Sequence, residues 1–459
     1  MAMSYKDFFA NKKIAVVGMG PHMEMVSDVI FLISLGATVT VYDMRSEPRV
    51  KHGLALLIEA GLQKYSFGTI PPEDLAANDL IIVSPDVPIA ASFFDVARKA
   101  EVRIEYPQTL FLKLAPSVTV VGVLGSCGKS TVSAMIFSVL KKAFTGKNLE
   151  AKNGNGKVVK EKAGQKKQGI FNLDPDAPGA LLFLKRVKAG DIVVARIPEE
   201  LTWAYEEARV SPHVAVYTTL SFKKNRDTNF NILQFQTYNN FIVANDSIMD
   251  EIRENSDPKP RAKMMRTGAN IVPGEWNIKY RGPYDKENAA LSIRVAELFK
   301  IPMTMVRGAL ERWSGLKGRL EPVKKVGGIE FFNDTASTGP IATLSALRTI
   351  SQQKNVILIL GGAFTDDSYE ELIDNIPQYV SAIILLPGSG TMRIRRGLAM
   401  IKDIPCVYAH TVEESVSLAK ENARKGDRIL FSPGFQVCGT DESRVARGER
   451  FVKAVKGLQ

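Results

Sequence analysis

A glycine-rich stretch offers the clearest chemistry in this chain. Gly125-Ser-Cys-Gly-Lys-Ser-Thr131 follows an apolar, β-branched run at residues 118–124 and precedes an amphipathic segment at residues 132–143. Between a strand and a helix, small residues let backbone N–H groups turn toward an anion, and the helix N-terminus adds partial positive charge. Lys129 can reach the outer phosphates of a nucleotide, and Ser130 can coordinate Mg2+. The stretch predicts a nucleotide phosphate site more strongly than a plain turn capped by Ser130.

The predicted nucleotide contacts cover the whole loop. They are Gly125, Ser126, Cys127, Gly128, Lys129, Ser130 and Thr131. The strict phosphate-loop pattern has glycine where Val123 stands, so the match is incomplete. The order of strand, loop and helix is nevertheless retained, and we expect ATP with Mg2+ as the ligand.

A second candidate site lies near the amino terminus. Residues 13–18 predict a short strand ending in Gly18-Met-Gly20, and residues 25–35 and 38–42 predict the next helix and strand. This order is typical of a Rossmann-like unit, in which Asp43 would meet a ribose or a base. Met23 replaces the third glycine of the dinucleotide fingerprint, so a tight turn without a ligand is an equal alternative. Ser84 follows another predicted strand, at the edge where ligands of open α/β sheets bind.

Length and composition indicate a multidomain globular protein. The chain has 459 residues, of which 45% are hydrophobic and 24% are charged, so two or three domains are expected. No apolar run is long enough to span a membrane, and residues 1–13 lack the apolar core of a signal peptide. We expect a cytoplasmic monomer without membrane insertion. The widely separated Cys127, Cys406 and Cys438 predict free thiols rather than disulfides or a zinc site.

The net charge of +11 is concentrated in one segment. Between residues 147 and 167, seven lysines stand beside only two glutamates. A solvated, flexible insert is the favoured interpretation. Nucleic acid is an unlikely partner, because no aromatic residues interleave with the lysines and no nucleic-acid module accompanies them.

Strands and helices alternate along the rest of the chain. Strands are predicted at residues 191–196, 214–219, 329–333, 355–360, 382–386 and 428–432, with helices at residues 288–299 and 341–350. This alternation predicts the α/β class, with mostly parallel sheets covered by helices on both faces. We expect a Rossmann-like N-terminal domain (1–113), a central P-loop ATPase-like domain (114–315) and a C-terminal Rossmann-like domain (316–459).

The order of the motifs resembles the Mur ligase family, the ATP-dependent amide ligases that build the peptide stem of peptidoglycan. The similar segments are the phosphate loop, Asn288-Ala-Ala290, Gly315-Leu-Lys-Gly-Arg-Leu-Glu321, Asn333-Asp-Thr-Ala-Ser-Thr338 and Ser432-Pro-Gly-Phe435. The resemblance covers nearly the whole chain. It implies that Asn288, Arg319 and Asp334 contact ATP.

The resemblance also implies the substrates and the reaction. The N-terminal domain would bind the UDP end of a UDP-linked muramoyl substrate through Gly20, Asp43, Arg45 and Ser84. The C-terminal domain would bind an amino acid, D-glutamate in the most similar branch, with Thr338 as a substrate contact. The substrate carboxylate attacks the γ-phosphate of ATP, and an amine then displaces phosphate from the acyl phosphate. Such a reaction depends on positioned cations, and Lys129 and Arg319 are the catalytic residues expected.

Several positions depart from the family pattern, among them three at which the family has catalytic residues. Arg196 stands where the family has a metal-binding glutamate, Asn245 where it has a carbamylated lysine, and Ala336 where it has another lysine. An arginine repels Mg2+, so we expect one ion, bound by Ser130. Arg196 either supplies the charge of a second ion or lies elsewhere, in solvent or paired with a neighbouring glutamate.

Three functions therefore remain open. The first is an active ligase of this family. The second is a nucleotide-binding protein derived from such a ligase but without turnover. The third is a P-loop enzyme of another class, including an ATPase linked to nucleic acid.

Overall fold

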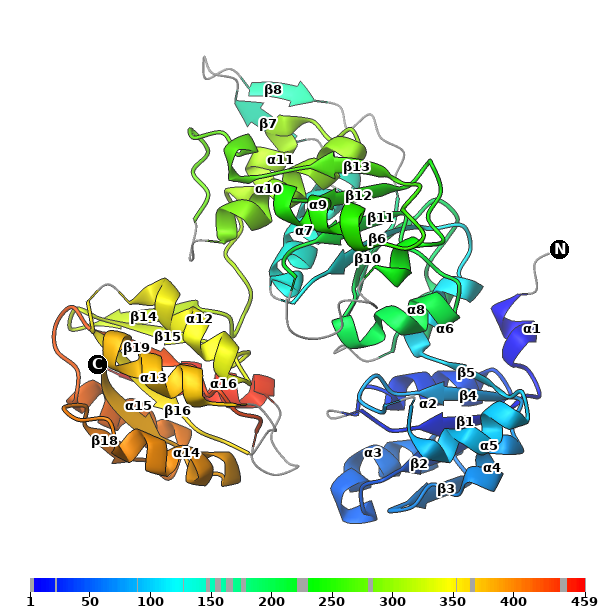
Figure 1. Cartoon of the computed structure of the whole chain (residues 1–459), viewed down its shortest axis with the longest axis horizontal. Helices are drawn as coiled ribbons and strands as arrows, with labels where there is room; N and C mark the ends of the chain where they lie inside the picture. Colours follow the sequence, from blue (N-terminus) through cyan, green and yellow to red (C-terminus); the bar gives the residue numbers. More distant parts are fainter. Residues whose placement is uncertain are drawn as a thin grey trace. The chain divides into compact units, whose positions relative to one another are not determined.

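The structure is a computed structural model that divides into two compact units. It describes residues 4–20, 23–88, 90–126, 128–145, 149–152, 158–161, 168–174, 179–220, 230–279, 284–351, 353–363, 368–437 and 444–458. The first unit comprises residues 1–278 and 286–313, and the second comprises residues 279–285 and 314–459. Two of the three large sheets belong to the first unit and one to the second (Figure 1).

The first sheet is fully parallel and has the strand order β3-β2-β1-β4-β5. Its strands are β1 (Lys13–Val17), β2 (Thr38–Asp43), β3 (Lys64–Phe67), β4 (Leu80–Val83) and β5 (Arg103–Glu105). The helices are α1 (Tyr5–Phe9), α2 (Val26–Ser34), α3 (Glu47–Glu59), α4 (Pro72–Ala76), the 3-10 turn η1 (Ser92–Phe94), α5 (Asp95–Lys99) and α6 (Pro107–Leu114). This arrangement confirms the Rossmann-like prediction.

Helices cover both faces of this sheet because β1 is apolar on both sides. Ile14 and Val16 pack in a cluster with residues of α2 and α3. Ala15 and Val17 pack in a second cluster with residues of α4 and α5. A continuous apolar run is what a parallel strand needs when it is buried on both faces.

The second sheet is also fully parallel, with the order β13-β12-β11-β6-β10-β9. Its strands are β6 (Thr119–Leu124), β9 (Ile170–Leu173), β10 (Ile192–Arg196), β11 (Val214–Tyr217), β12 (Phe241–Ala244) and β13 (Lys263–Arg266). The α-helices are α7 (Lys129–Thr145), α8 (Thr202–Glu207), α9 (Asp246–Asn255), α10 (Asp285–Leu298) and α11 (Met303–Leu310). Short 3-10 turns are η2 (Leu181–Lys185), η3 (Glu199–Leu201), η4 (Asn231–Leu233) and η5 (Ala269–Ile271).

Val123, which replaces the first glycine of the phosphate-loop pattern, is a core residue of β6. Its side chain is fully buried in the cluster formed with α7, α10 and α11. The strand thus continues with its regular pairing to β10 and β11, and the loop begins only at Gly125.

The third sheet has the order β14-β15-β19-β16-β17-β18 and is parallel except for the antiparallel edge strand β14. Its strands are β14 (Glu321–Val326), β15 (Ile329–Asn333), β16 (Val356–Leu360), β17 (Val380–Leu385), β18 (Cys406–Tyr408) and β19 (Arg428–Phe431). The helices are α12 (Pro340–Ile350), α13 (Glu370–Tyr379), α14 (Ser389–Ala399), α15 (Val412–Glu421) and α16 (Arg444–Lys456). The predicted mostly parallel α/β class is confirmed.

The lysine-rich segment differs in part from the prediction of a flexible insert. It contains the antiparallel strands β7 (Leu149–Lys152) and β8 (Val158–Glu161), whereas its other residues from 147 to 167 lie outside the described ranges. Repeated lysines have low strand propensity, which is why these short strands were missed. Among the helices in the described ranges, none is long and apolar enough to cross a bilayer.

Candidate functional site

Two glycines shape the loop between β6 and α7. Gly125 and Gly128 have φ angles of +120° and +84°, in the left-handed region that residues with a Cβ rarely adopt. A Cβ on Gly125 would lie 2.4 Å from the carbonyl oxygen of Thr219. A Cβ on Gly128 would lie 3.2 Å from Asn288 Oδ1, so the structure brings the predicted Asn288 to the loop. Glycine is therefore required at both positions, by the backbone conformation and by the close packing of the loop on Thr219 and Asn288.

Lys129 and Ser126 hold this loop in place. Lys129 Nζ donates hydrogen bonds to the carbonyl oxygens of Gly125 and Ser126, the second at 3.2 Å. Ser126 N donates to Thr219 O at 3.0 Å, and the two hydroxyl oxygens are 2.9 Å apart. The ammonium group therefore lies over the loop, where phosphate oxygens would replace its carbonyl partners.

Ser130 and Thr131 lie in the first turn of α7 and are partly exposed. Cys127, also predicted as a contact, lies outside the described residues. Across the described ranges, no group of three or more His, Cys, Asp or Glu side chains could hold a metal ion.

The loop lies at the point where the strand order of the second sheet changes direction. β6 has β10 on one side and β11 on the other. The connection through α7 and β9 leads to the first neighbour, and the chain then passes to the second. Ligands of open α/β sheets bind outside the carboxyl ends of strands at such a switch point.

Arg196 ends β10 and is paired with Asp174, which follows β9. Its Nε and Nη2 atoms donate to Asp174 Oδ1 at 2.9 and 2.6 Å. The alternative that Arg196 points into solvent is wrong, because its side chain is only 11% exposed. Asp174 is not among the residues predicted from the sequence, because it lies 22 residues before Arg196 in the chain.

Asn245 is the N-cap of α9. It follows β12 and begins α9, and its Oδ1 accepts a hydrogen bond from Ile248 N at 3.0 Å. Asn is among the best residues for this capping role. β11 separates β12 from the phosphate-loop strand β6.

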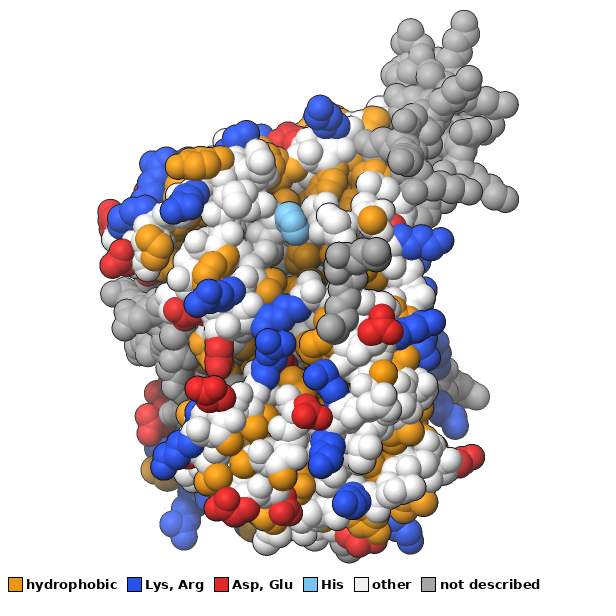
Figure 2. All heavy atoms as spheres, turned by 90° about the vertical axis from the view of Figure 1, so that its right-hand side faces the viewer, with side chains coloured by type: hydrophobic (Ala, Val, Ile, Leu, Met, Phe, Trp, Pro, Cys, Tyr) orange, Lys and Arg blue, Asp and Glu red, His pale blue; other side chains and the backbone are white. Residues whose placement is uncertain are grey.

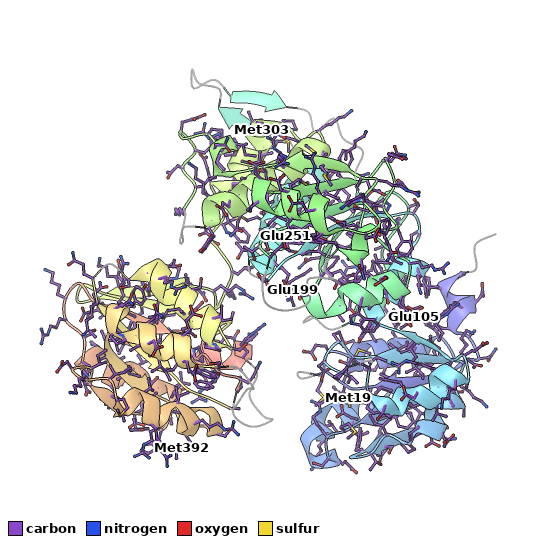
Figure 3. All side chains as sticks on the ribbon, viewed as in Figure 1. Met19, Glu105, Glu199, Glu251, Met303 and Met392 are labelled. Carbon is purple, nitrogen blue, oxygen red and sulfur yellow. The ribbon has the colours of Figure 1, made fainter. Side chains whose placement is uncertain are left out.

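A second cluster forms where β1, β2 and β4 end. Asp43 Oδ2 accepts from Met19 N at 2.9 Å, and Met19 is labelled in Figure 3. Arg45 Nε and Nη2 donate to the two carboxylate oxygens of Asp43 at 2.9 and 2.7 Å. Arg45 Nη2 also donates to Gly20 O at 3.1 Å. Burial acts to raise the pKa of Asp43, but the hydrogen bonds and charge of Arg45 and the N–H of Met19 outweigh it and lower the pKa. The charged form ties the Gly18–Gly20 turn to the end of β2.

Ser84 belongs to the same cluster. Its N–H donates to Val17 O at 2.8 Å, and its side chain lies 3.0 Å from where a Cβ of Gly18 would be. Its hydroxyl donates to the carboxylate of Asp86. Met23, at the position of the missing third glycine, has a φ of +63°, so the chain keeps the left-handed conformation that glycine favours.

A third cluster in the second unit is centred on Asp334, which follows β15. Its Oδ1 accepts from Leu320 N at 3.0 Å, and its Oδ2 accepts from Ser337 Oγ at 2.6 Å and Ser432 Oγ at 2.8 Å. Burial raises the pKa of Asp334 to about 6, against the opposing effect of these donors. Three motifs separated in the sequence thus meet at one carboxylate.

Arg319 and Thr338 lie in the segments that Asp334 connects. Arg319 is exposed and lies near enough to favour the charged form of Asp334. Gly318 N donates to Glu321 Oε2 at 2.8 Å, and Ala336 N donates to Gly318 O at 2.8 Å. Thr338 is partly buried, between the Asp334 loop and α12.

Sequence comparisons identify two known domains in the chain. Residues 12–105 match "Mur ligase MurD-like, N-terminal domain", and residues 318–435 match "Mur ligase, glutamate ligase domain". UDP-N-acetylmuramoylalanine--D-glutamate ligase of Bdellovibrio bacteriovorus is 28% identical over 98% of this chain and 99% of its own length. The enzyme of the same name from Roseiflexus sp. is 25% identical, with coverage of 98% and 99%. This chain belongs to the Mur ligase family.

Solved structures show the same fold. UDP-N-acetylmuramate-alanine ligase MurC from Thermotoga maritima has a TM-score of 0.56 and 16% identity, covering 98% of this chain and all of that one. MurF ligase from Thermotoga maritima in complex with ADP has a TM-score of 0.52 and 15% identity, with coverage of 97% and 96%. These similarities support the three-domain Mur ligase architecture.

In this Mur ligase, the predicted site residues fall into three separate clusters. The phosphate loop and Asn288 form the first; Gly20, Asp43, Arg45 and Ser84 form the second; Arg319, Asp334 and Thr338 form the third. The first two clusters belong to the first unit and the third to the second unit.

Residues that were not predicted from the sequence support these clusters. Thr219 lies beneath the phosphate loop, and its neighbour Thr218 donates its hydroxyl to Leu124 O at 3.0 Å. Asn333 Nδ2 donates to Glu321 Oε2 at 3.0 Å beside the Asp334 loop. The two threonines directly follow the β11 strand, which is the signal that could have identified them.

On the face that Figure 2 displays, the described residues form no continuous basic patch. Lys and Arg side chains are interspersed there with Asp and Glu side chains. A nucleic-acid site is expected to present clustered basic groups. The nucleic-acid alternative therefore gains no support from this face.

Proposed function

We propose that this Mur ligase is an ATP-dependent ligase of peptidoglycan precursor synthesis. It joins D-glutamate to UDP-N-acetylmuramoyl-L-alanine through an acyl phosphate. Relatives whose printed name states this substrate pair match over nearly their full length, and the matched C-terminal domain is described as a glutamate ligase domain. The observation that carries the proposal is the loop after β6, where Lys129 lies over a glycine cradle beside Asn288.

The phosphate loop would bind and orient ATP. Mg2+-ATP, when bound, supplies the phosphoryl group that converts the substrate carboxylate into an acyl phosphate with a good leaving group. Gly125 and Gly128 supply the left-handed backbone conformations of the loop, and Lys129 would neutralise the charge of the phosphate oxygens. Ser130, partly exposed in the first turn of α7, would be the protein ligand of the ion. The residues present therefore fit both groups.

The cluster at the ends of β1, β2 and β4 would bind the UDP end of the muramoyl substrate. Asp43 accepts hydrogen bonds from Met19 N and Arg45, so it is a positioning residue for the turn around Gly20. Arg45 and Ser84 lie at the same sheet edge and would orient the nucleotide portion.

The cluster in the second unit would bind the amino acid and would contribute contacts to the phosphates of ATP. Arg319 is an exposed cation suited to phosphate oxygens, and Asp334 positions its segment through Leu320 N. Thr338, in the same loop, would contact substrate. Holding an amine near an acyl phosphate supplies the proximity that this reaction requires.

A second candidate is a nucleotide-binding protein without turnover, and one observation favours it. Arg196, where the family has a metal-binding glutamate, is paired with Asp174 in this chain. That ion pair replaces a metal ligand with a neutralised cation, which removes support for a second Mg2+.

A product assay separates the two candidates. The protein is incubated with Mg2+-ATP, UDP-N-acetylmuramoyl-L-alanine and each of several amino acids, including D- and L-glutamate, and mass spectrometry detects the product. An amide product with D-glutamate and one phosphate released per product supports the ligase. Nucleotide binding without any amide product supports the second candidate. Hydrolysis stimulated by nucleic acid alone would overturn both.

A further inference from the structure

A cavity of about 410 Å³ lies beside the edge strand β5, and none of the predicted site residues that the structure describes lines it. One wall comes from the segment leading into β5, from β5 itself and from α6. The other wall comes from α8 and the residues after it, which belong to the second sheet's half of the same unit. The volume is in the range of small-molecule sites, which is roughly 300–1,000 Å³.

The base of the cavity is a buried polar group held in a fixed position. Glu105, labelled in Figure 3, is only 4% exposed. Its Oε1 is 2.5 Å from Lys113 Nζ, and its Oε2 accepts from Thr109 Oγ1 at 3.2 Å. Because Glu105 is already paired, it fixes the position of Lys113 and leaves recognition to the other lining groups.

The cavity lining carries exposed charges of both signs. Arg103, Arg209, Glu101 and Glu207 all line the cavity and are exposed, and in the described parts of the chain none of them forms an ion pair. Glu101 and Arg209 also have φ angles of +57° and +53°, a conformation that costs energy for residues with a Cβ. Glu101 follows the short helix α5 and Arg209 follows the short helix α8, and both residues line the cavity.

Two aromatic side chains also line the cavity: the buried Tyr106, 3% exposed, and Trp203. Tyr106 and Trp203 form an edge-to-face pair with ring centroids 5.6 Å apart, and Trp203 stays partly exposed. Burial and the nearby charge of Glu207 both raise the pKa of the Tyr106 hydroxyl. That negative charge would favour an ammonium group at this end of the cavity.

We propose that this cavity is an additional ligand site, which binds a small zwitterion with an apolar group, of the amino-acid or dipeptide class. The carboxylate would pair with Arg103 and Arg209, the ammonium would pair with Glu101 and Glu207, and the apolar group would pack on Trp203 and Tyr106. A simple anion would leave the two glutamates uncompensated, and a simple cation would leave the two arginines uncompensated. Because both walls contribute contacts, an occupant would link the two halves of the first unit.

Three matched probes test the proposal on the full chain. They are L-phenylalanine, 3-phenylpropionate, which lacks the amine, and phenethylamine, which lacks the carboxylate. Binding is followed by tryptophan fluorescence excited where none of the probes absorbs, and it is checked by calorimetry. The chain has three tryptophans, so Trp203→Phe shows whether the signal comes from the cavity.

L-phenylalanine should bind at least about fivefold more tightly than either single-charge probe, because partly exposed ion pairs change affinity by roughly this factor. Arg209→Gln and Glu207→Gln should each weaken its binding by about the same factor. Arg348→Gln, an exposed position in the second unit, is the matched control and should have no effect. Equal binding of the zwitterion and a single-charge probe, a signal that survives Trp203→Phe, or no binding at all would each overturn the proposal. None of these outcomes depends on ligase activity.

Discussion

Asp28 is a buried carboxyl group whose protonation should control part of the stability of the first unit. It lies in α2, is 2% exposed, and accepts a hydrogen bond from Leu181 N at 2.8 Å, at the start of η2. Burial raises its pKa to about 7, although the backbone N–H groups around Leu181 favour the charged form. Asp28→Asn keeps an acceptor for Leu181 N but removes the ionisable group.

The sign of the effect follows from proton binding. The folded state holds the proton more tightly than the unfolded chain, whose pKa is 3.8. The stability contributed by this group is therefore full below pH 3.8 and is lost as the pH rises to about 7. A shift of roughly 3 pKa units corresponds to about 4 kcal/mol. The free energy of unfolding of the wild type, relative to Asp28→Asn, should fall by about this amount between pH 4 and pH 8.

Tryptophan fluorescence during urea denaturation measures the relevant transition, because Trp203, Trp276 and Trp313 all belong to the first unit. Other carboxyl groups titrate in both proteins, so their contribution cancels in the difference. Asp74→Asn, at an exposed position, is the control and should follow the wild-type pH profile. Parallel profiles for the wild type and Asp28→Asn would refute the reasoning.

Four further outcomes are expected. Lys129→Ala should weaken ATP binding by about tenfold or more in calorimetry, because it removes a charged contact. Lys141→Ala, on the exposed side of α7, is the control and should leave the affinity unchanged. Equal ATP affinity in the wild type and both variants would contradict the phosphate-loop assignment. Gly125→Ala should lower stability and nucleotide affinity together, since its Cβ would collide with Thr219 O, and wild-type melting and binding would show that the loop can relax. Arg196→Glu should make thermal stability depend on Mg2+, because it places a second carboxylate beside Asp174, and a melting temperature indifferent to Mg2+ would reject this geometry. Asp334→Ala should lower stability by about 1–3 kcal/mol and speed hydrogen exchange at Leu320 N, whereas unchanged exchange would show that another group holds that segment.

The sequence alone was sufficient to predict the strands and helices, and those site residues that lie together in one continuous segment. The run before Gly125 predicts a strand because all of its residues except Thr119 are apolar, and β6 is buried on both faces. The residue type permits the positive φ angles of Gly125 and Gly128 without steric cost. The GxG turn and Asp43 could likewise be identified, because a short strand, a turn, a helix and a second strand lie within one continuous stretch.

Only the tertiary structure decided which distant groups meet. Arg196 pairs with Asp174 because β10 lies between β6 and β9, and Thr219 supports Gly125 because β11 lies on the other side of β6. Strand order depends on how the helices pack over the sheet, which no local pattern specifies. The cavity beside β5 has the same origin: its walls are about a hundred residues apart in the chain and become neighbours only when the two halves of the first unit pack together.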